Sequence, residues 1–322
     1  MRNIRWARTQ GVGQLVEEHE LHPVTRAVTA VRKARWRRRH GVSPGEAVPV
    51  FLFGAPRSGT NMMVRGLDVS PEFEVYNDGD APAFLRHRLR SDEVVRSLVM
   101  RSRHRFVLFK PILDADRVVE LLDELGTPRP PRALWAYRDV DGRTRSALTK
   151  FGPAALRAMR AIAAGGGSHL WQSGGLSDES LDLIRGVDWD RADPADGAAM
   201  LWLVLNRQLF ERGLDVREDV LPVSYDTLVR APEATVRVIC RFLGVAWDPG
   251  LAAHIDRRSL RPREPLRLDP AIRERCEALA ALLDAASAAA ATRWSQPGPE
   301  AGPRTGPRTG PGTGPDGPPG TR

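Results

Sequence analysis

A turn bounded by glycines, at residues 54–60, carries residue types that bind phosphate. Its spacing, Gly54-x4-Gly59-Thr60, is that of a P-loop, in which backbone N–H groups and the start of the next helix hold phosphate oxygens. A Walker A motif would place a lysine between Gly59 and Thr60, and none stands here. The turn can still bind a single 5′-phosphate through the Thr60 hydroxyl and the planar Arg57 side chain. The alternative is a plain glycine turn with an exposed Arg57.

The elements that would position this turn alternate between strand and helix. Apolar runs predict strands at residues 48–53, 105–110, 133–137 and 220–224, and we expect helices after the first three of these, over most of 153–212, at 232–243 and at 269–291. Strands separated by helices imply an α/β fold of the P-loop type, with three layers and a central parallel sheet flanked by helices. In such sheets ligands bind beyond the carboxyl ends of the strands.

The chain resembles the sulfotransferases that use 3′-phosphoadenosine-5′-phosphosulfate (PAPS), in their bacterial and tyrosylprotein branches. The first similar stretch is Pro-Arg-Ser-Gly-Thr at 56–60. The second is Tyr-Arg at the end of the third predicted strand, followed eight residues after Arg138 by Ser146. The third is a strand leading to Tyr225 and, further on, Phe-Leu-Gly at 242–244, although Asp226 stands where the family usually has Glu. The resemblance covers roughly residues 48–250.

This resemblance implies that PAPS is the donor co-substrate and that two strand ends hold it. The turn would bind the 5′-phosphate, Arg138 with Ser146 would bind the 3′-phosphate, and Tyr225 would lie near the adenine. A strand-end arginine and a hydroxyl on the next helix can hold one phosphate from two sides. The residues implied to bind the nucleotide are Arg57, Ser58, Gly59, Thr60, Asn61, Arg138, Ser146 and Tyr225.

The cations needed for sulfonyl transfer are implied at Lys110 and Arg57. Negative charge builds up on the oxygens around the sulfur during transfer, so positive side chains beside them lower the barrier. Lys110 ends the second predicted strand, where the family presents a catalytic residue, and the chain has only three lysines. An ordinary solvated lysine is the alternative. No metal is expected, because PAPS has no polyphosphate chain and these cations supply the charge.

The general base is expected at Asp78, in the stretch where one branch of the family has a carboxylate, with Asp80 in reserve. Many members instead use a histidine shortly after the second strand, but Pro-Ile-Leu stands there, and His104 precedes that strand. Asn-Asp-Gly at 77–79 is also a common turn signal, so a turn role for Asp78 remains open.

Charge is concentrated at the ends of the chain. Of the net charge of +8, residues 1–45 carry +7 and residues 295–322 carry +1, so the stretch 46–294 is neutral and general nucleic-acid binding is not indicated. Residues 26–40 would form a basic helix with a thin apolar stripe, suited to an anionic membrane surface or an acidic partner. A solvated helix packed on the domain is the alternative.

Composition predicts three regions: a basic N-terminal helical extension at 1–45, a sulfotransferase domain at 46–294, and a disordered Gly/Pro-rich tail at 295–322. The two cysteines, Cys240 and Cys276, have no spacing typical of a zinc site or a disulfide scaffold. No apolar run is long enough for a membrane span, and the N-terminus lacks a signal-peptide core. A soluble cytoplasmic protein is therefore expected.

The function expected is transfer of a sulfonyl group from PAPS to a hydroxyl or amine of a small molecule, glycan, lipid headgroup or peptide. Two alternatives remain open. A kinase-like phosphotransferase would need the missing P-loop lysine. A non-catalytic nucleotide-binding module would keep Arg138 and Ser146 but lose Lys110 and the base.

Overall fold

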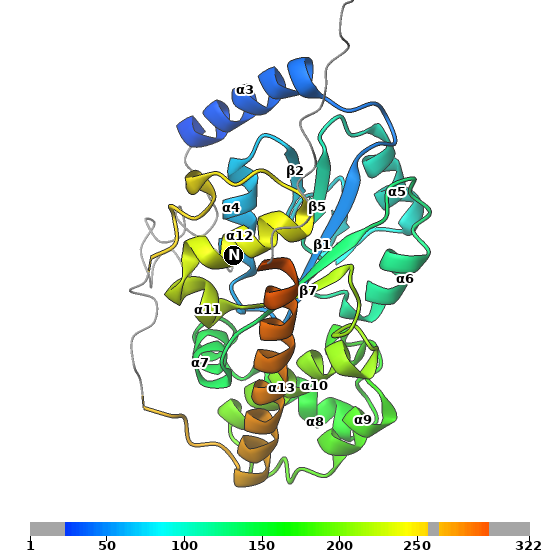
Figure 1. The fold of residues 1–322 in the computed structure, drawn as a ribbon. Coiled ribbons are helices and arrows are strands. Elements are labelled where there is room, and N and C mark those ends of the chain that lie inside the picture. Colours follow the sequence, from blue (N-terminus) through cyan, green and yellow to red (C-terminus); the bar gives the residue numbers. More distant parts are fainter. Residues whose placement is uncertain (1–22, 257–263, 296–322) are drawn as a thin grey trace, which may run out of the picture.

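A five-stranded parallel sheet forms the centre of the computed structural model, which describes residues 23–256 and 264–295 (Figure 1). The strand order is β2-β5-β1-β6-β7, and every neighbouring pair is parallel. The bounds are β1 Val48–Gly54, β2 Phe73–Tyr76, β5 Phe106–Phe109, β6 Arg132–Tyr137 and β7 Val220–Ser224. The α/β class and the four predicted strands are confirmed. Strand β2 was not predicted, because it is an edge strand in which only Phe73 is fully buried, whereas all four residues of β5 are buried.

Helices cover both faces of the sheet, and residues of β1 alternate between two cores. Val50 and Leu52 pack with α4 and α12, whereas Phe51 and Phe53 pack with the helices of the other face. Burial on both sides explains why β1 is a continuous apolar run. The helix bounds are α3 Pro23–His40, α4 Thr60–Val69, α5 Asp92–Arg101, α6 Val118–Asp123, α7 Val140–Phe151, α8 Ala154–Ala163, α9 Asp178–Arg185, α10 Pro194–Glu211, α11 Tyr225–Arg230, α12 Pro232–Leu243 and α13 Pro270–Ser295; short 3-10 turns are η1 Ala115–Arg117, η2 Trp171–Ser173 and η3 Pro249–Leu251.

Helix α13 covers the β7 edge of the sheet, where it is the orange helix at the centre of Figure 1. The Ser287 hydroxyl donates to the Pro222 carbonyl of β7 at 3.1 Å. Pro222 lacks an N–H, so β7 suits an edge position, and α13 shields the strand from pairing with another chain. The predicted tail, apart from Ser295, lies outside the described residues.

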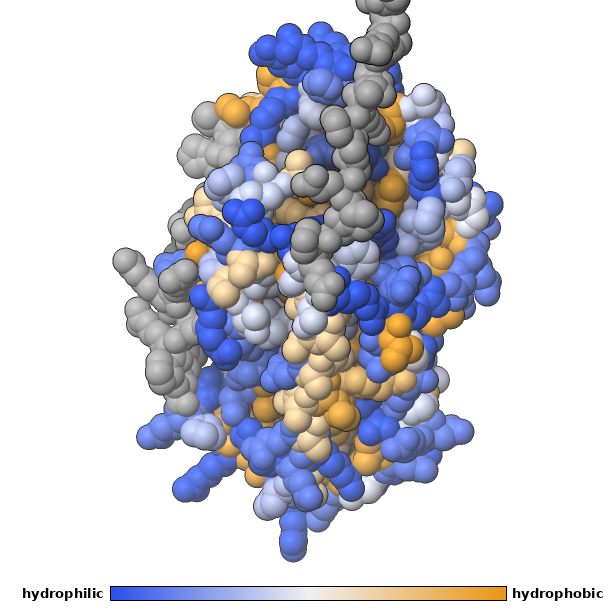
Figure 2. Space-filling model, viewed as in Figure 1, coloured by the Kyte–Doolittle hydropathy of each residue, from blue (hydrophilic) through white to orange (hydrophobic). Residues whose placement is uncertain are grey.

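Helix α3 packs on the domain through one side. Lys33 forms an ion pair with Asp68 at the end of α4, and the Trp36 ring stacks on His104 with centroids 6.0 Å apart. Val28 and Val31 are exposed among arginines, and Figure 2 shows a mainly hydrophilic surface over α3 at the top of the molecule. None of the helices in the described part of the chain is long and apolar enough to span a bilayer.

A small hairpin, β3 Phe84–Leu85 and β4 Arg88–Leu89, lies between β2 and α5 in the chain. Its two turn residues, Arg86 and His87, both have positive φ, 51° and 67°. Turns of this kind usually contain Gly, Asn or Asp, because other side chains disfavour the left-handed region. The sequence did not predict the hairpin, since it has no such turn signal and its strands are too short to show alternation.

Candidate functional site

The turn at residues 54–60 connects β1 to α4 and has a tightly constrained backbone. Gly54 and Gly59 have φ of 138° and 88°, and Arg57 has φ of 76°. A Cβ at Gly54 would lie 2.1 Å from the Ala136 carbonyl oxygen, and one at Gly59 would lie 2.3 Å from the Tyr225 ring. Both glycines are therefore needed for the close approach of β6 and α11 to the turn.

Two hydroxyls are buried in the turn. The Ser58 and Thr60 side chains are almost fully enclosed, and the Ser58 Oγ has no hydrogen-bond partner among the described residues. Helix α4 begins here without a side-chain cap, with Gly59 at its N-cap. A helix start of this kind offers backbone N–H groups and a positive dipole end to an anion.

The second predicted phosphate site adjoins the first. Arg57 Nε donates to Ser146 Oγ of α7 at 2.9 Å, so the turn and the hydroxyl predicted to bind the 3′-phosphate are in direct contact. The Arg138 guanidinium lies 4.3 Å above the ring of Tyr225, which itself packs against Gly59. The structure thus brings together predicted residues from β1, β6, α7 and α11 at one edge of the sheet.

Two hydrogen bonds hold the backbone at Arg138 and Asp139, where β6 leads into α7. The Trp202 indole N–H donates to the Arg138 carbonyl at 2.9 Å, and the Asp139 N–H donates to Asp226 Oδ2 at 2.8 Å. Burial raises the pKa of Asp226 above its ordinary value, while the Asp139 N–H opposes this shift. Asp226 therefore braces this junction. The Arg138 Nε is buried without a hydrogen-bond partner among the described residues.

A buried arginine that the sequence analysis missed, Arg143, holds the turn at residues 54–60 through the Pro56 carbonyl. Arg143 is 1% exposed and donates to the Pro56 carbonyl at 3.1 Å and to the Ala198 carbonyl at 2.6 Å. Desolvation, together with the charge of Arg57, lowers the pKa of Arg143 to about 10, so it stays charged at neutral pH. This cation adds to the positive potential of the turn. Nothing distinguishes Arg143 from the other arginines of the sequence, and only the position of α10 buries it.

Lys110 lies next to the turn and is enclosed. Its side chain is 6% exposed, and its Nζ lies 2.7 Å from Asn61 Oδ1 in the first turn of α4 and 2.7 Å from Asp78 Oδ1. The structure therefore excludes the alternative that Lys110 is an ordinary solvated lysine. The predicted catalytic residues Lys110 and Asp78 form one ion pair beside the predicted phosphate site.

Asp78 has a second contact that the sequence did not indicate. His87 Nδ1, from the turn of the β3–β4 hairpin, lies 3.5 Å from Asp78 Oδ2 and 3.2 Å from the Asp78 carbonyl oxygen. Asp80, the reserve base, accepts from the Asn77 N–H at 2.7 Å and so stabilises the turn that carries Asp78. His104 precedes β5, so it lies at the opposite end of that strand from Lys110, where burial lowers its pKa.

The hairpin is attached to the end of β5 by a buried carboxylate, Asp114. It accepts from the Leu89 N–H at 3.0 Å, and its other oxygen lies 2.8 Å from Arg88 Nε, an ion pair without the alignment of a hydrogen bond. Burial raises the pKa of Asp114 to about 6. The position of His87 over Asp78 therefore depends on this anchor.

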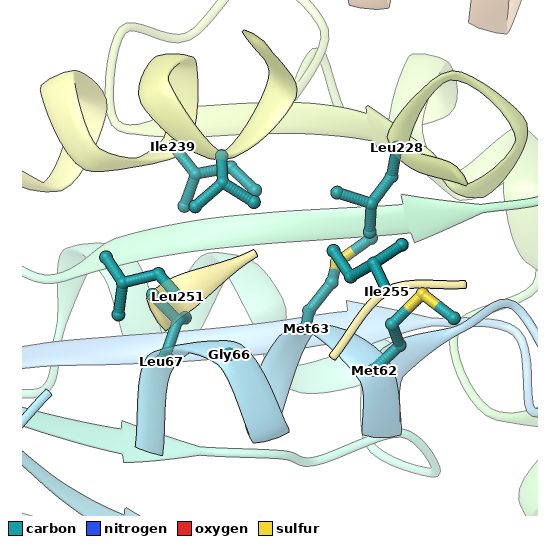
Figure 3. A pocket seen from close by; sticks show the side chains of 9 residues that line it. Met62, Met63, Gly66, Leu67, Leu228, Ile239, Leu251 and Ile255 are labelled. Carbon is teal, nitrogen blue, oxygen red and sulfur yellow. The ribbon is translucent and has the colours of Figure 1, made fainter. Parts of the chain in front are cut away.

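Two hollows lie near the site. Figure 3 shows the smaller one between α4, α12 and the η3 segment; it is lined by apolar side chains such as Met62, Met63 and Leu228, and its volume of about 10 Å³ holds at most one water. A cleft of about 380 Å³ opens beside Arg138 on the side of α13. Its walls carry charges of both signs: the carboxylates of Asp139, Asp226 and Asp284 and the guanidinium groups of Arg138 and Arg230.

Among the described residues, no group of His, Cys, Asp and Glu side chains is arranged to hold a metal ion. The described groups around the turn suit an anion instead. They are the backbone N–H groups at the start of α4, the hydroxyls of Ser58 and Thr60, and the nearby cations.

No protein-family model matches the chain. Solved structures that match it are a sulfotransferase from Alicyclobacillus acidocaldarius (20% identity, 77% of this chain and 99% of that chain, TM-score 0.41), the sulfotransferase domain from the curacin biosynthetic pathway (14%, 74% and 98%, TM-score 0.43) and the sulfotransferase domain from the Synechococcus PCC 7002 olefin synthase (19%, 81% and 100%, TM-score 0.36). The chain is therefore similar over most of its length to structures of the class that its motifs resemble.

Proposed function

We propose that this protein is a sulfotransferase that moves a sulfonyl group from PAPS to a hydroxyl or amine and releases 3′-phosphoadenosine-5′-phosphate (PAP). The observation that carries the proposal is the contact between the two predicted phosphate sites, where Arg57 donates to Ser146. The sites lie at the ends of the neighbouring strands β1 and β6. One adenine nucleotide, with phosphates on its 5′ and 3′ positions, could therefore occupy both.

The residues present fit an anionic nucleotide. Ser58 Oγ is buried without a hydrogen-bond partner among the described residues, and such a hydroxyl costs about 1–3 kcal/mol unless a ligand satisfies it. Arg138 Nε is buried with the Asp139 carboxylate 3.7 Å away, an ion pair beyond hydrogen-bond distance. Phosphate oxygens are acceptors that both atoms can donate to. The ring of Tyr225, next to Gly59 and Arg138, is the side chain we assign to the adenine.

The transfer step follows from the position of Lys110. The acceptor oxygen or nitrogen attacks the sulfur in line, a new bond to sulfur forms, and the bond between sulfur and the 5′-phosphate oxygen breaks, so PAP leaves with the electron pair. Lys110, next to Asn61 at the start of α4, stabilises the negative charge that builds up there. Arg57 shares this role from the turn, and Asp78 holds the Lys110 ammonium group in place.

Each alternative function disagrees with one feature of this chain. A kinase-like phosphotransferase has no lysine at the P-loop position between Gly59 and Thr60. A module that only binds nucleotide has no use for the enclosed Lys110, because removing its charge from water costs free energy that binding at the turn does not require. Both features favour catalysis of sulfonyl transfer.

The test uses calorimetric titration with PAP and an assay of labelled PAPS turnover on one preparation. We expect PAP to bind, ATP to bind more weakly, and turnover of PAPS with an acceptor panel of phenols, sugars, amines and tyrosine peptides. Binding of PAP without turnover of PAPS across the panel would support the binding module. Mg²⁺-dependent hydrolysis of ATP without PAP binding would support the phosphotransferase.

A further inference from the structure

The turn of the β3–β4 hairpin has an unusual composition. Both of its residues, Arg86 and His87, have left-handed backbone conformations that Gly or Asn adopts at less cost. Residues held in such conformations are retained where the surrounding structure or the function requires their side chains. Gly or Asn at position 87 would therefore form the same turn at less cost than His87 does.

The side chain of His87 is directed at the predicted catalytic pair. Its Nδ1 lies 3.2 Å from the Asp78 carbonyl oxygen and 3.5 Å from Asp78 Oδ2, while Asp78 Oδ1 lies 2.7 Å from Lys110 Nζ. One carboxylate thus has the lysine at one oxygen and the imidazole at the other. His87 is 55% exposed, Asp78 25% and Lys110 6%, so the imidazole is the side chain of this group that is most open to an incoming acceptor.

The contact of Nδ1 with two oxygens selects the tautomer of the neutral ring. Both neighbours of Nδ1 are acceptors, so Nδ1 carries a hydrogen, and in the neutral ring Nε2 is the nitrogen with the free lone pair. The Asp78 carbonyl oxygen holds Nδ1 at 3.2 Å, and the Asp78 carboxylate, 3.5 Å away, stabilises the imidazolium once the ring takes up a proton. A positioned imidazole beside a carboxylate can act as a general base.

We propose that His87 is a further catalytic residue of the sulfonyl transfer, and that Asp78 is its positioning residue. This inference rests on the proposed function. As the acceptor hydroxyl attacks sulfur, His87 Nε2 takes its proton, the bond between acceptor oxygen and sulfur forms, and PAP leaves with the electrons of the broken sulfur–oxygen bond. The imidazolium formed is stabilised by Asp78. Direct proton uptake by Asp78 would disrupt its contact with Lys110 or with His87.

The decisive variant is His87→Asn, because Asn tolerates the left-handed backbone, keeps a donor for Asp78 and has no basic nitrogen. His169→Asn, at an exposed loop histidine outside the site, is the matched control. We expect His87→Asn to bind PAP within about twofold of the wild type and to lose about 100-fold or more in turnover, as is typical for removal of a general base. The control keeps full turnover.

A second measurement separates a base from a merely structural residue. In the reverse direction, PAP takes the sulfonyl group from an aryl sulfate, and the imidazolium of His87 returns a proton to the leaving phenol. The 4-nitrophenolate ion leaves without a proton, but unsubstituted phenolate is a poorer leaving group and depends on protonation. We expect His87→Asn to lose much more activity with phenyl sulfate than with 4-nitrophenyl sulfate.

Three results overturn the assignment: full turnover by His87→Asn, equal losses with both aryl sulfates, or loss of PAP binding in step with turnover. Loss of turnover in Asp78→Asn together with full activity in His87→Asn would make Asp78 the base and reject His87. If the wild type transfers no sulfonyl group from PAPS or from either aryl sulfate, the proposed function itself is rejected, and this failure is distinct from that of His87 alone.

Discussion

The two sides of the candidate site are built differently. On the side proposed to hold the donor, Ser58, Thr60 and Arg143 are buried, and the turn is packed between the ends of β1 and β6 and helix α11. On the side proposed for the acceptor, a two-residue turn presents His87 to solvent and is held by the anchor at Asp114. The difference is the one expected if fixed, enclosed groups bind a donor common to a reaction class and an exposed loop meets the variable acceptor.

The largest effect is expected from Lys110→Met, at the boundary between the two sides. Loss of the ammonium group should lower turnover of PAPS about 100- to 1,000-fold, because the charge that develops during transfer loses its cation, while PAP affinity changes little. Steady-state turnover with labelled PAPS and calorimetry with PAP measure the two quantities. Lys33→Met, at the lysine that pairs with Asp68 at the far end of α4, is the control. Full activity of Lys110→Met would remove the lysine from the mechanism.

The next effect belongs to the donor side alone. Arg138→Ala should weaken PAP binding about 10- to 100-fold, because a charge-assisted hydrogen bond contributes about 1.5–3 kcal/mol. The exposed Arg185 of α9 offers a matched Arg→Ala control. If calorimetry gave the same PAP affinity for Arg138→Ala and the wild type, the 3′-phosphate would not lie at the end of β6, and the donor side would have to be redrawn.

A pair of glycine substitutions compares the packing of the two sides directly. Gly59→Ala places a Cβ 2.3 Å from the Tyr225 ring at a φ of 88°, so we expect a loss of about 1–3 kcal/mol in the free energy of unfolding and weaker PAP binding. Gly79→Ala, next to Asp78, meets no atom within 4 Å and should unfold within about 0.5 kcal/mol of the wild type. Denaturant titration of both variants measures the difference. Equal losses would show that the two sides are equally packed.

The same contrast explains what the sequence could predict. The four buried strands and the turn at 54–60 could be predicted, because such strands are continuous apolar runs and the glycines occur at a fixed spacing. The contact of Arg57 with Ser146 could be anticipated only through the resemblance, since their separation along the chain has no local signal.

The acceptor side could not be predicted in the same way. Strands β3 and β4 have two residues each, and the Arg86-His87 turn lacks the Gly or Asn that marks a hairpin. His87 therefore gave no signal, although Asp78 beside it did. Arg143 was missed for a different reason: its burial is a tertiary property, set by the carbonyls of Pro56 and Ala198 around it.

The smallest expected effect is on the pH dependence of stability, through Asp114, the carboxylate that anchors the hairpin. Burial raises the pKa of Asp114 to about 6 from an ordinary value of 3.8, so the folded state binds this proton more tightly than the unfolded state. The contribution of Asp114 to stability is therefore fully present below pH 3.8 and is lost as the pH rises through about 6. Between pH 5 and pH 7 the free energy of unfolding therefore falls by about 1 kcal/mol.

The test compares the wild type with Asp114→Asn, because Asn can still accept from the Leu89 N–H but does not titrate. Denaturant titrations at pH 5 and pH 7 should show that the wild type loses about 1 kcal/mol more than Asp114→Asn over this interval. Hydrogen exchange at the Leu89 amide should follow the same difference, because the hairpin opens there. An identical pH dependence in both proteins would mean that Asp114 is ionised throughout, and that the acceptor side is anchored as firmly as the donor side.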